Sequence, residues 1–265
     1  MELKERIALV TGGGQGIGRG IAIGLAKEGA WVAVNDLSRD RAESTAQEII
    51  ALGRQAIVIP ANVADAQEVS SMVSRVKGEW GRIDILVNNA GIAPAKMVED
   101  MDKDEWDNVL DVNLGGVFNC SKAVIEIMKS QGGGGKIVCI SSLAGKLMSF
   151  NAGANYTASK AAILGFTRHL AFELGPYGIN VNAVCPGFTL TPLLEKSLPP
   201  DQMEAVKKRM PLRSLVTPEH VANAVVFLAS DKARMITGCS IDVDAGGSLA
   251  WQDWDSYVSA RRKGA

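Results

Sequence analysis

The fold is decided by residues 6–18, RIALVTGGGQGIG, in which a short apolar run leads directly into a turn with five glycines. An apolar run without polar alternation is typical of a strand covered on both faces, so we predict a strand at Arg6–Thr11. Glycines permit a tight turn and let the backbone N–H groups of a following helix approach an anion such as a pyrophosphate. The pattern predicts a dinucleotide-binding turn, with an ordinary strand–helix turn as the alternative.

Six further apolar runs alternate with amphipathic helical stretches. Asp65 with Glu68 resembles a capping box, and Thr217-Pro218 has the pattern of an N-cap followed by proline at the first helical position. Such alternation predicts the α/β class: a doubly wound, Rossmann-type parallel sheet of about seven strands with helices on both faces. The further predicted strands are Trp31–Asp36, Gln55–Pro60, Ile83–Asn88, Lys136–Ser141, Ile179–Val184 and Ser240–Asp244.

No linker or composition break divides the 265 residues. We therefore predict one Rossmann-type domain at residues 1–248, with a substrate-loop insertion at 189–215, and a C-terminal aromatic tail at 249–265. The apolar residues of the insertion could close over a ligand or serve helix packing. The tail carries Trp251, Trp254 and Tyr257, which could anchor on a neighbouring subunit or border its active site.

Charge and residue usage exclude several classes of function. The 28 basic and 29 acidic residues leave a net charge of −1, which gives no reason to expect nucleic acid or an anionic membrane as a partner. Four cysteines without a C-x-x-C pair, and two histidines without an H-E-x-x-H pattern, predict reduced core cysteines and no metal site. No apolar run reaches the roughly 18 residues of a membrane span, and the N-terminal run is too short for a signal peptide. We expect a cytoplasmic protein with no membrane partner.

An acidic residue, Asp36, closes the second predicted strand. A carboxylate there can accept hydrogen bonds from the ribose hydroxyls of an adenosine and would repel a 2′-phosphate. Gln15 in the turn is neutral and offers no compensating charge, while Arg39 is a nearby cation that keeps NADP open. The pattern favours NAD over NADP as the cofactor.

Tyr156 and Lys160 are four residues apart, so on a helix they share a face. A free phenol has a pKa of about 10, and a nearby cation favours the phenolate. Lowering that pKa to about 7 needs ~4 kcal/mol, for which Lys160 and the positive ring of an oxidised nicotinamide are candidate sources. Tyr156 could then take the hydroxyl proton of an alcohol while a hydride leaves its carbon. An ordinary solvated helix face is the alternative.

Together these motifs resemble the short-chain dehydrogenase/reductase family, over residues from about 3 to 250. The matching elements are the cofactor turn Thr11-Gly12-x-x-x-Gly16-x-Gly18, the N-N-A-G element Asn88-Asn89-Ala90-Gly91, the catalytic pair Tyr156-x-x-x-Lys160, and Pro186-Gly187 after the sixth strand.

The resemblance implies a catalytic set of Asn113, Ser142, Tyr156 and Lys160. Asn113 would hold a water that links Lys160 to solvent, and Ser142 would hydrogen-bond the substrate oxygen. Because Gly115-Gly116 follows Asn113 in a helical pattern, we expect a local irregularity there. Ser142 lies 14 residues before Tyr156, one more than the family's common spacing, so the resemblance places a one-residue insertion beside the substrate.

The resemblance also implies the contacts to the cofactor. Asn62-Val63 stands where the family usually has Asp-Val against the adenine, and an amide oxygen can still accept from the adenine amine. Thr189, through its backbone, and Thr191, through its hydroxyl, match positions that hold the nicotinamide carboxamide. The predicted cofactor-binding residues are Gly12, Gln15, Gly16, Ile17, Gly18, Asp36, Leu37, Asn62, Val63, Asn89, Ala90, Gly91, Tyr156, Lys160, Pro186, Gly187, Thr189 and Thr191.

We predict an NAD(H)-dependent oxidoreductase that interconverts a secondary alcohol and a ketone. A small neutral diol, polyol or cyclic alcohol is the expected substrate, because no arginine is placed to bind a carboxylate, although Lys96 and Lys146 are candidate cations. The alternative is a 3-oxoacyl-thioester reductase, against which Asp36 counts because biosynthetic reduction usually draws on NADPH. A non-catalytic dinucleotide-binding protein is a third reading. The resemblance implies a homotetramer, and the helical stretches around residues 104–130 and 155–175 carry surplus apolar residues that subunits could bury.

Overall fold

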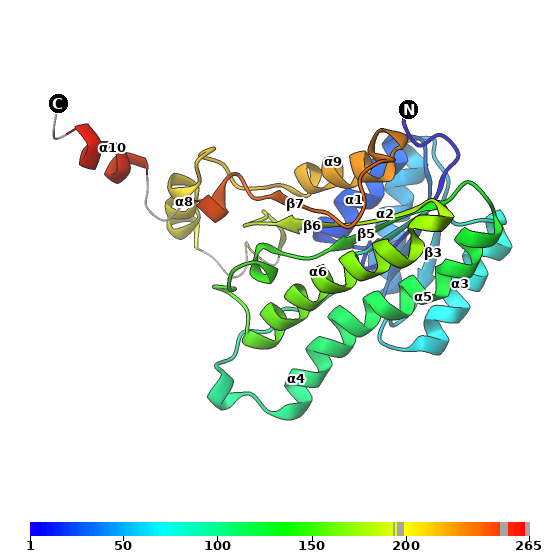
Figure 1. Cartoon of the computed structure of the whole chain (residues 1–265), viewed down its shortest axis with the longest axis horizontal. Helices are drawn as coiled ribbons and strands as arrows, with labels where there is room; N and C mark the ends of the chain where they lie inside the picture. Colours follow the sequence, from blue (N-terminus) through cyan, green and yellow to red (C-terminus); the bar gives the residue numbers. More distant parts are fainter. Residues whose placement is uncertain (193, 195–198, 250–253, 263–265) are drawn as a thin grey trace.

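The computed structural model describes residues 1–192, 194, 199–249 and 254–262, and its seven described strands form one parallel sheet (Figure 1). The strand order is β3-β2-β1-β4-β5-β6-β7, and every neighbouring pair is parallel. All seven strands overlap the predicted ranges, which confirms the doubly wound parallel sheet. The strands are β1 Ile7–Val10, β2 Trp31–Asp36, β3 Ala56–Pro60, β4 Ile85–Asn88, β5 Gly135–Ile140, β6 Ile179–Pro186 and β7 Ser240–Val243.

Two apolar cores lie on opposite faces of the sheet, because successive side chains of a strand point to opposite sides. In β1, Ala8 and Val10 pack with residues of α1, α2 and α9, whereas Ile7 and Leu9 pack with residues of α3, α5 and α6. Figure 1 shows α9 and α1 above the sheet and α6 and α5 below it. The helices named here are α1 Gly16–Lys27, α2 Arg39–Ala51, α3 Ala66–Trp80, α4 Lys103–Leu110, α5 Gly116–Ser130, α6 Ala154–Leu174, α8 Pro200–Arg209, α9 Pro218–Ala229 and α10 Trp254–Arg262.

The helix starts follow the predicted capping patterns in part. Thr217 caps α9 as predicted: its hydroxyl accepts from the N–H of His220, and its own N–H donates to His220 Nδ1 at 3.1 Å. At α3, Asp65 accepts from the N–H of Glu68, but the Glu68 carboxylate accepts from the N–H of Asn62 at 2.8 Å. The predicted capping box of α3 is therefore only half formed, because Glu68 reaches past Asp65 to the end of β3.

The carboxyl ends of the strands bring the predicted site residues to one edge of the sheet. β1 and β4 are neighbours in the sheet, although β2 and β3 lie between them in the chain, so the winding reverses at this point. In open α/β sheets, ligands bind outside the carboxyl ends of the strands at such a switch point. Thr11 follows β1, Asp36 ends β2, Asn88 ends β4 and Pro186 ends β6.

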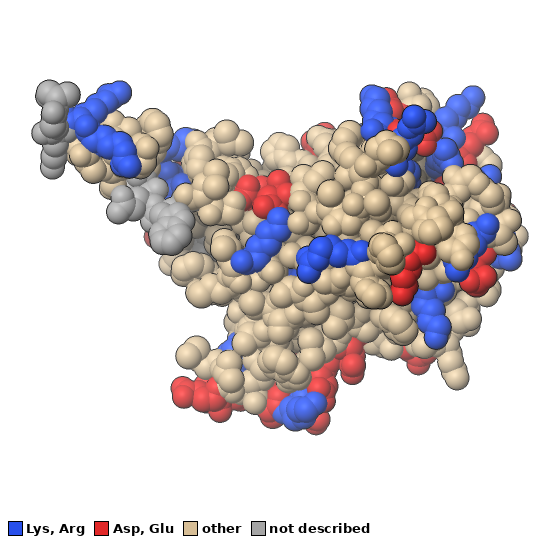
Figure 2. Space-filling view, viewed as in Figure 1, with Lys and Arg blue, Asp and Glu red and all other residues tan. Residues whose placement is uncertain are grey.

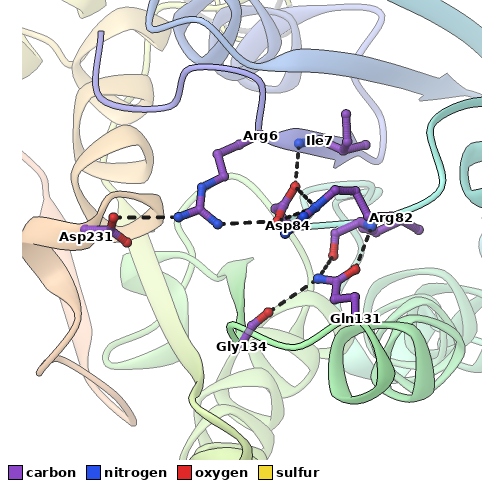
Figure 3. Close-up of polar contacts among 8 residues, drawn as sticks. Arg6, Ile7, Arg82, Asp84, Gln131, Gly134 and Asp231 are labelled. Atoms are coloured by element: carbon purple, nitrogen blue, oxygen red, sulfur yellow. Dashed lines mark hydrogen bonds and ion pairs between the residues drawn. The ribbon is translucent and has the colours of Figure 1, made fainter.

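The opposite, amino edge of the sheet is held by a network of charged side chains (Figure 3). Asp84, buried with 3% of its surface exposed, accepts from the N–H of Ile7 at 2.9 Å and from Arg82 Nη2 at 2.6 Å. Arg6 bridges Asp84 at 3.4 Å and Asp231 at 3.6 Å. The network joins the starts of β1 and β4 to the segment after α9, on the far side of the sheet from the predicted site.

Three excluded classes can be compared with the structure. No helix among the described residues is long and apolar enough to cross a membrane. The described ranges also contain no group of three or more His, Cys, Asp or Glu side chains that could hold a metal ion. All four cysteines are free, and Cys120, Cys139 and Cys185 are buried. The prediction of core cysteines is wrong at Cys239, which is exposed because it directly precedes the edge strand β7.

The insertion at residues 189–215 divides its apolar side chains between packing and solvent. Leu194 and Leu215 are buried, whereas Leu212 is exposed. A cavity of about 310 Å³ lies within the insertion, against α8, with Leu190 and Met203 among its lining residues. The buried leucines serve packing, and closure of the insertion over a ligand stays a prediction.

The described part of the tail, α10, projects away from the sheet (Figure 1). Trp254 stacks on Tyr257 with 5.7 Å between the ring centroids, and Asp255 lies 3.5 Å from Arg213. Trp251 lies outside the described residues. The predicted anchoring of the tail on a neighbouring subunit stays a prediction.

Candidate active site

The glycine turn between β1 and α1 adopts backbone angles that need glycine. Gly12 and Gly16 have φ values of +59° and +53°, in the region that other residues rarely adopt. A Cβ at Gly18 would lie 2.1 Å from the carbonyl oxygen of Gly12, so any side chain would displace the turn. Gln15, the N-cap of α1, makes no capping hydrogen bond through its side chain. The first N–H groups of α1 can therefore face an anion.

Thr11 and Asn89 fasten this turn to the end of β4. The Thr11 hydroxyl accepts from the N–H groups of Asn89 and Ala90 at 3.0 and 3.1 Å. The Asn89 amide donates to the carbonyl oxygens of Thr11 and Gly12 at 2.9 and 3.1 Å. Asn89, predicted as a cofactor contact, thus positions the turn through its side chain. Sequence reasoning missed this role of Thr11, whose signal is a hydroxyl at the strand end before the glycines.

Asp36 is buried at the end of β2, and its carboxylate already has protein partners. One oxygen, Oδ2, accepts from the N–H of Gly14 at 3.1 Å. The other, Oδ1, accepts from the N–H of Ser38 at 3.0 Å and from Arg41 Nη2 and Nε at 2.9 and 3.2 Å. The nearby cation that sequence reasoning named, Arg39, pairs instead with Glu43 at 2.9 Å. The cation beside Asp36 is therefore Arg41, which sequence reasoning missed.

The other predicted adenosine contacts lie next to Asp36 or just after the neighbouring strand, β3. Leu37 follows Asp36 directly and is exposed. Asn62 Oδ1, the oxygen expected to accept from an adenine amine, accepts from the N–H of Ala64 at 3.1 Å. Val63 is buried, and a Cβ at Gly116 would lie 2.7 Å from its methyl group. Val63 therefore also sets the closest approach of α5 to the end of β3.

The residues after β6 lie beside the glycine turn. Gly187 follows Pro186, and its N–H donates to the carbonyl oxygen of Val243 at 2.9 Å. The Thr189 hydroxyl donates to the carbonyl oxygen of Gly187 at 3.0 Å. A Cβ at Gly16 would lie 3.6 Å from the methyl group of Thr191. The structure thus brings Thr191, far away in the sequence, to the start of α1.

Asn113 lies in a π-helical turn at Asp111–Gly115, which confirms the predicted irregularity. Its side chain is fully buried. Its Oδ1 accepts from the N–H of Ile92 at 2.8 Å, and its Nδ2 donates to the carbonyl oxygen of Ile92 at 3.0 Å and to Ser159 Oγ at 3.1 Å. A Cβ at Gly91 would lie 3.1 Å from Asn113 Oδ1 and 3.6 Å from Lys160 Nζ. Asn113 and Lys160 therefore converge on Gly91.

Tyr156, Lys160 and Ser142 meet where β5 ends against α6. Lys160 Nζ donates to the carbonyl oxygen of Ile140 at 2.9 Å and lies 5.6 Å from the centroid of the Tyr156 ring. Ser142 hydrogen-bonds the Tyr156 side chain and accepts from the N–H of Ala144 at 3.1 Å. The neighbouring serine has another task, since Ser141 Oγ donates to the carbonyl oxygen of Lys160 at 2.8 Å.

Burial moves the pKa of Tyr156 and the pKa of Lys160 in opposite directions. Burial lowers the pKa of Lys160 to about 8, against a smaller opposing effect of the thiols of Cys139 and Cys185. Burial also raises the pKa of Tyr156 above its usual value, against a smaller lowering by the hydrogen bond with Ser142. In the chain by itself, the pKa of Tyr156 therefore shifts opposite to the expected direction, because burial outweighs the hydrogen bond with Ser142.

Both candidate cations near the predicted pocket, Lys96 and Lys146, are paired with acidic side chains. Lys96 Nζ lies 2.6 Å from Glu105, and Lys146 Nζ lies 2.6 Å from Asp242. Both ammonium groups are thus paired across segments that border the site. Because both cations already have acidic partners, the expectation of a substrate without a carboxylate does not change.

Comparison with known proteins gives matches along nearly the whole chain. A family model described as enoyl-(acyl carrier protein) reductase matches residues 12–248. The chain is similar to the 3-oxoacyl-[acyl-carrier-protein] reductase of Staphylococcus epidermidis, with 44% identity over 243 residues, which cover 91% of this chain and 98% of the relative. A corresponding reductase of Synechocystis is 42% identical over 246 residues, which cover 92% of this chain and 97% of the relative.

Two solved structures show the same architecture. A 3-oxoacyl-[acyl-carrier protein] reductase with bound NAD from Brucella melitensis has a TM-score of 0.85 and 38% identity, and the match covers 92% of each chain. A structure of levodione reductase has a TM-score of 0.89 and 33% identity, and the match covers 94% of this chain and 100% of the other.

Proposed function

Because the chain belongs to the short-chain dehydrogenase/reductase family, we propose that it reduces the 3-oxo group of an acyl thioester to a 3-hydroxyacyl group. The observation that carries the proposal is the junction of Tyr156, Ser142 and Lys160 beside the glycine turn. The high identity to 3-oxoacyl-[acyl-carrier-protein] reductases favours this substrate over the small neutral alcohol that sequence reasoning preferred. The cavity within the insertion has Leu190, Met203 and Leu215 among its lining residues, which suit contact with an alkyl chain.

The cofactor of this proposal is a nicotinamide dinucleotide, and the residues present fit one. The first N–H groups of α1 have no side-chain cap and would face a pyrophosphate, and the glycines at residues 12–14 and 16 keep side chains off this part of the turn. Asp36 would bind the adenosine ribose, and Asn62 and Val63 would border the adenine. Thr189 and Thr191 would hold the carboxamide. Asp36 favours NAD(H) as the cofactor.

When bound in its reduced form, the dinucleotide supplies the hydride for the reduction. Ser142 donates a hydrogen bond to the ketone oxygen, and the Tyr156 hydroxyl transfers its proton to that oxygen as negative charge develops there. A raised pKa keeps Tyr156 protonated at neutral pH, which suits a proton donor. The Lys160 ammonium stabilises the phenolate that remains and then returns a proton to it. Asn113, buried beside Gly91, would position the route by which Lys160 regains a proton from solvent.

A second candidate is the oxidation or reduction of a cyclic or vicinal alcohol and ketone. The observation that favours it is the similarity to levodione reductase along 94% of this chain. A non-catalytic dinucleotide-binding protein remains the third candidate, against which the assembled catalytic set counts. We also propose a cytoplasmic location, which the free cysteines support.

A substrate panel followed by NADH and NADPH absorbance tests the proposal. We expect acetoacetyl thioester to be reduced faster than a cyclic diketone, and diols to be oxidised slowly. Tyr156→Phe should keep dinucleotide affinity but lose turnover by about 10²- to 10⁴-fold, because the proton donor is gone. Tyr177→Phe is the matched control, since that exposed tyrosine packs under Lys129 outside the site.

Three results would contradict the proposal. Faster turnover of the cyclic diketone than of the thioester would favour the second candidate. Dinucleotide binding without turnover of any substrate would favour the third. Substantial activity in Tyr156→Phe would remove Tyr156 from its proposed role.

A further inference from the structure

We propose that Arg41 lets this site accept NADP(H) as well as NAD(H), by neutralising Asp36 and offering its guanidinium to the 2′-phosphate. The inference rests on the proposed dinucleotide site and names a residue that determines its specificity. It bears directly on the substrate, because Asp36 was the main argument against a reductase that draws on NADPH.

The Asp36 carboxylate already has hydrogen-bond partners within the chain. An unpaired carboxylate at the end of β2 would repel a 2′-phosphate. Here Oδ1 accepts two hydrogen bonds from Arg41, at 2.9 and 3.2 Å, and a third from the N–H of Ser38 at 3.0 Å. Oδ2 accepts from the N–H of Gly14 at 3.1 Å, so a lone pair of Oδ2 is left for a ribose hydroxyl. The pair is therefore close to neutral and can still bind a ribose.

The Arg41 side chain is accessible to a ligand. Its side chain is 44% exposed, whereas that of Asp36 is 6% exposed. A guanidinium has five N–H donors, of which the two bonds to Asp36 use one on Nε and one on Nη2. The remaining donors are on the half-exposed end of the side chain, beside the carboxylate that would bind the ribose. Guanidinium groups suit this task because they bind phosphates in a forked geometry.

The glycine turn and α2 hold Arg41 in place. A Cβ at Gly14 would lie 2.7 Å from both the Arg41 Cβ and Asp36 Oδ2. Gly14 is a variable position of the family motif, yet only glycine lets the first turn of α2 approach this closely. The Ser38 side chain accepts from the N–H of Arg41, and Thr45 Oγ1 donates to its carbonyl oxygen at 3.3 Å. The Arg41 position is thus fixed by the turn on one side and by α2 on the other.

Binding of two dinucleotide fragments, measured by isothermal titration calorimetry, separates the role of Arg41 from that of the site. The probes are ADP-ribose and 2′-phospho-ADP-ribose. We expect the unchanged protein to bind the two within about tenfold of each other. Arg41→Gln should weaken 2′-phospho-ADP-ribose by about 10- to 100-fold, the range of charge-assisted hydrogen bonds, and change ADP-ribose by less than about threefold. Arg41→Lys should recover part of the loss.

The matched control is Arg39→Gln, which removes an arginine from the same helix turn that pairs with Glu43. It should change neither affinity, and thermal unfolding should show that all variants remain folded. An equal loss of both ligands in Arg41→Gln would mean that Arg41 only positions Asp36, and would overturn the inference. Rejection of 2′-phospho-ADP-ribose by the unchanged protein would also overturn it. Failure of ADP-ribose to bind would instead refute the proposed dinucleotide site itself.

Discussion

At the scale of single residues, burial acts against charge on both members of the proposed catalytic pair, Tyr156 and Lys160. It raises the pKa of Tyr156 and lowers the pKa of Lys160 to about 8. A protonated phenol and an ammonium ion are the forms that a ketone reductase needs, and both coexist at neutral pH. The same pair would begin an alcohol oxidation only after the phenol is deprotonated. These protonation states suit the proposed reduction.

The pKa of Lys160 predicts the pH dependence of reduction. The ammonium form is populated below a pKa of about 8 and is lost as the pH rises through that value. We therefore expect kcat/KM for reduction to be level near neutral pH and to fall above about pH 8, because kcat/KM reports the pKa values of the free enzyme. Initial rates across this range measure the profile. Lys160→Arg, where active, should lose the decline because its guanidinium stays charged. A profile that rises above pH 8 would contradict this assignment.

The sequence predicts which residues lie at the site better than it predicts the contacts that their side chains make. Tyr156 and Lys160 could be paired from their spacing alone, since a helix places residues four apart on one face. The partner of Asp36 could not be named in the same way, because Arg39 and Arg41 lie in one helix turn. Only the close approach at Gly14 decides that Arg41 faces the carboxylate. The pKa direction of Tyr156 was missed because burial cannot be read from the spacing.

At the scale of elements, the glycine turn is the part of the molecule with the least room for change. Gly18 meets the backbone of the same turn and Gly12 meets the backbone of Ala90 just after β4, and neither backbone can move away as a flexible side chain would. Elsewhere the chain carries glycines in open space, such as Gly78 on an exposed face of α3. Substitution by alanine should lower the free energy of unfolding at the crowded glycines and raise it at the open ones.

The prediction compares Gly18→Ala with Gly78→Ala. A methyl group at residue 18 would lie 2.1 Å from the carbonyl oxygen of Gly12, so we expect the free energy of unfolding to fall by about 1–3 kcal/mol and dinucleotide binding to be lost. At residue 78 nothing lies within 4 Å, and we expect a gain of about 0.5–1 kcal/mol from helix propensity. Urea denaturation measures both. Unchanged stability of Gly18→Ala would show that the turn can relax.

Strands and helices were predictable because the apolar runs are nearly continuous and the sheet buries both faces. The six-residue β2 matches its predicted range end to end, as an apolar run closed by Asp36. Contacts between elements could not be predicted from the apolar runs. Glu68 bonds the end of β3 instead of completing its own cap, and Thr191 reaches α1 from the insertion. The first contact spans the six residues from Asn62 to Glu68, whereas the second joins segments far apart in the sequence.

At the scale of the whole molecule, the two edges of the sheet have separate tasks. The carboxyl edge holds the proposed site, while the charged network around Asp84 holds the amino edge (Figure 3). Because the network touches none of the predicted site residues, stability and activity should respond separately to changes at the amino edge.

Asp84→Ala tests this separation. It would leave the buried N–H of Ile7 without its acceptor and remove a shared partner of Arg82 and Arg6. We expect the free energy of unfolding to fall by about 1–3 kcal/mol, with KM for substrate and dinucleotide unchanged at temperatures where the variant is folded. Asp231→Ala is the control: its side chain is 81% exposed and lies 3.6 Å from Arg6, so stability should barely change. A large change in KM would contradict the separation.

We propose that the protein assembles as a homotetramer that uses α5 and α6. Phe172 is 85% exposed on α6, and Phe118 on α5 is also exposed. Figure 2 shows a broad uncharged area over the lower parts of α5 and α6. Light scattering should give four chain masses, and Phe172→Asp should reduce the mass, whereas Ile50→Asp on α2 should not. A monomeric unchanged protein would contradict the proposal.

The position of Cys239 has a practical consequence for such measurements. Burial raises the pKa of Cys120 to about 12 and the pKa of Cys185 to about 11, and it also raises the pKa of the Cys139 thiol. Thiolates react with maleimides, so these three cysteines should stay unlabelled at neutral pH. Cys239 alone is exposed among the four. One fluorophore per chain could therefore be placed at the free edge of the sheet without any engineered cysteine.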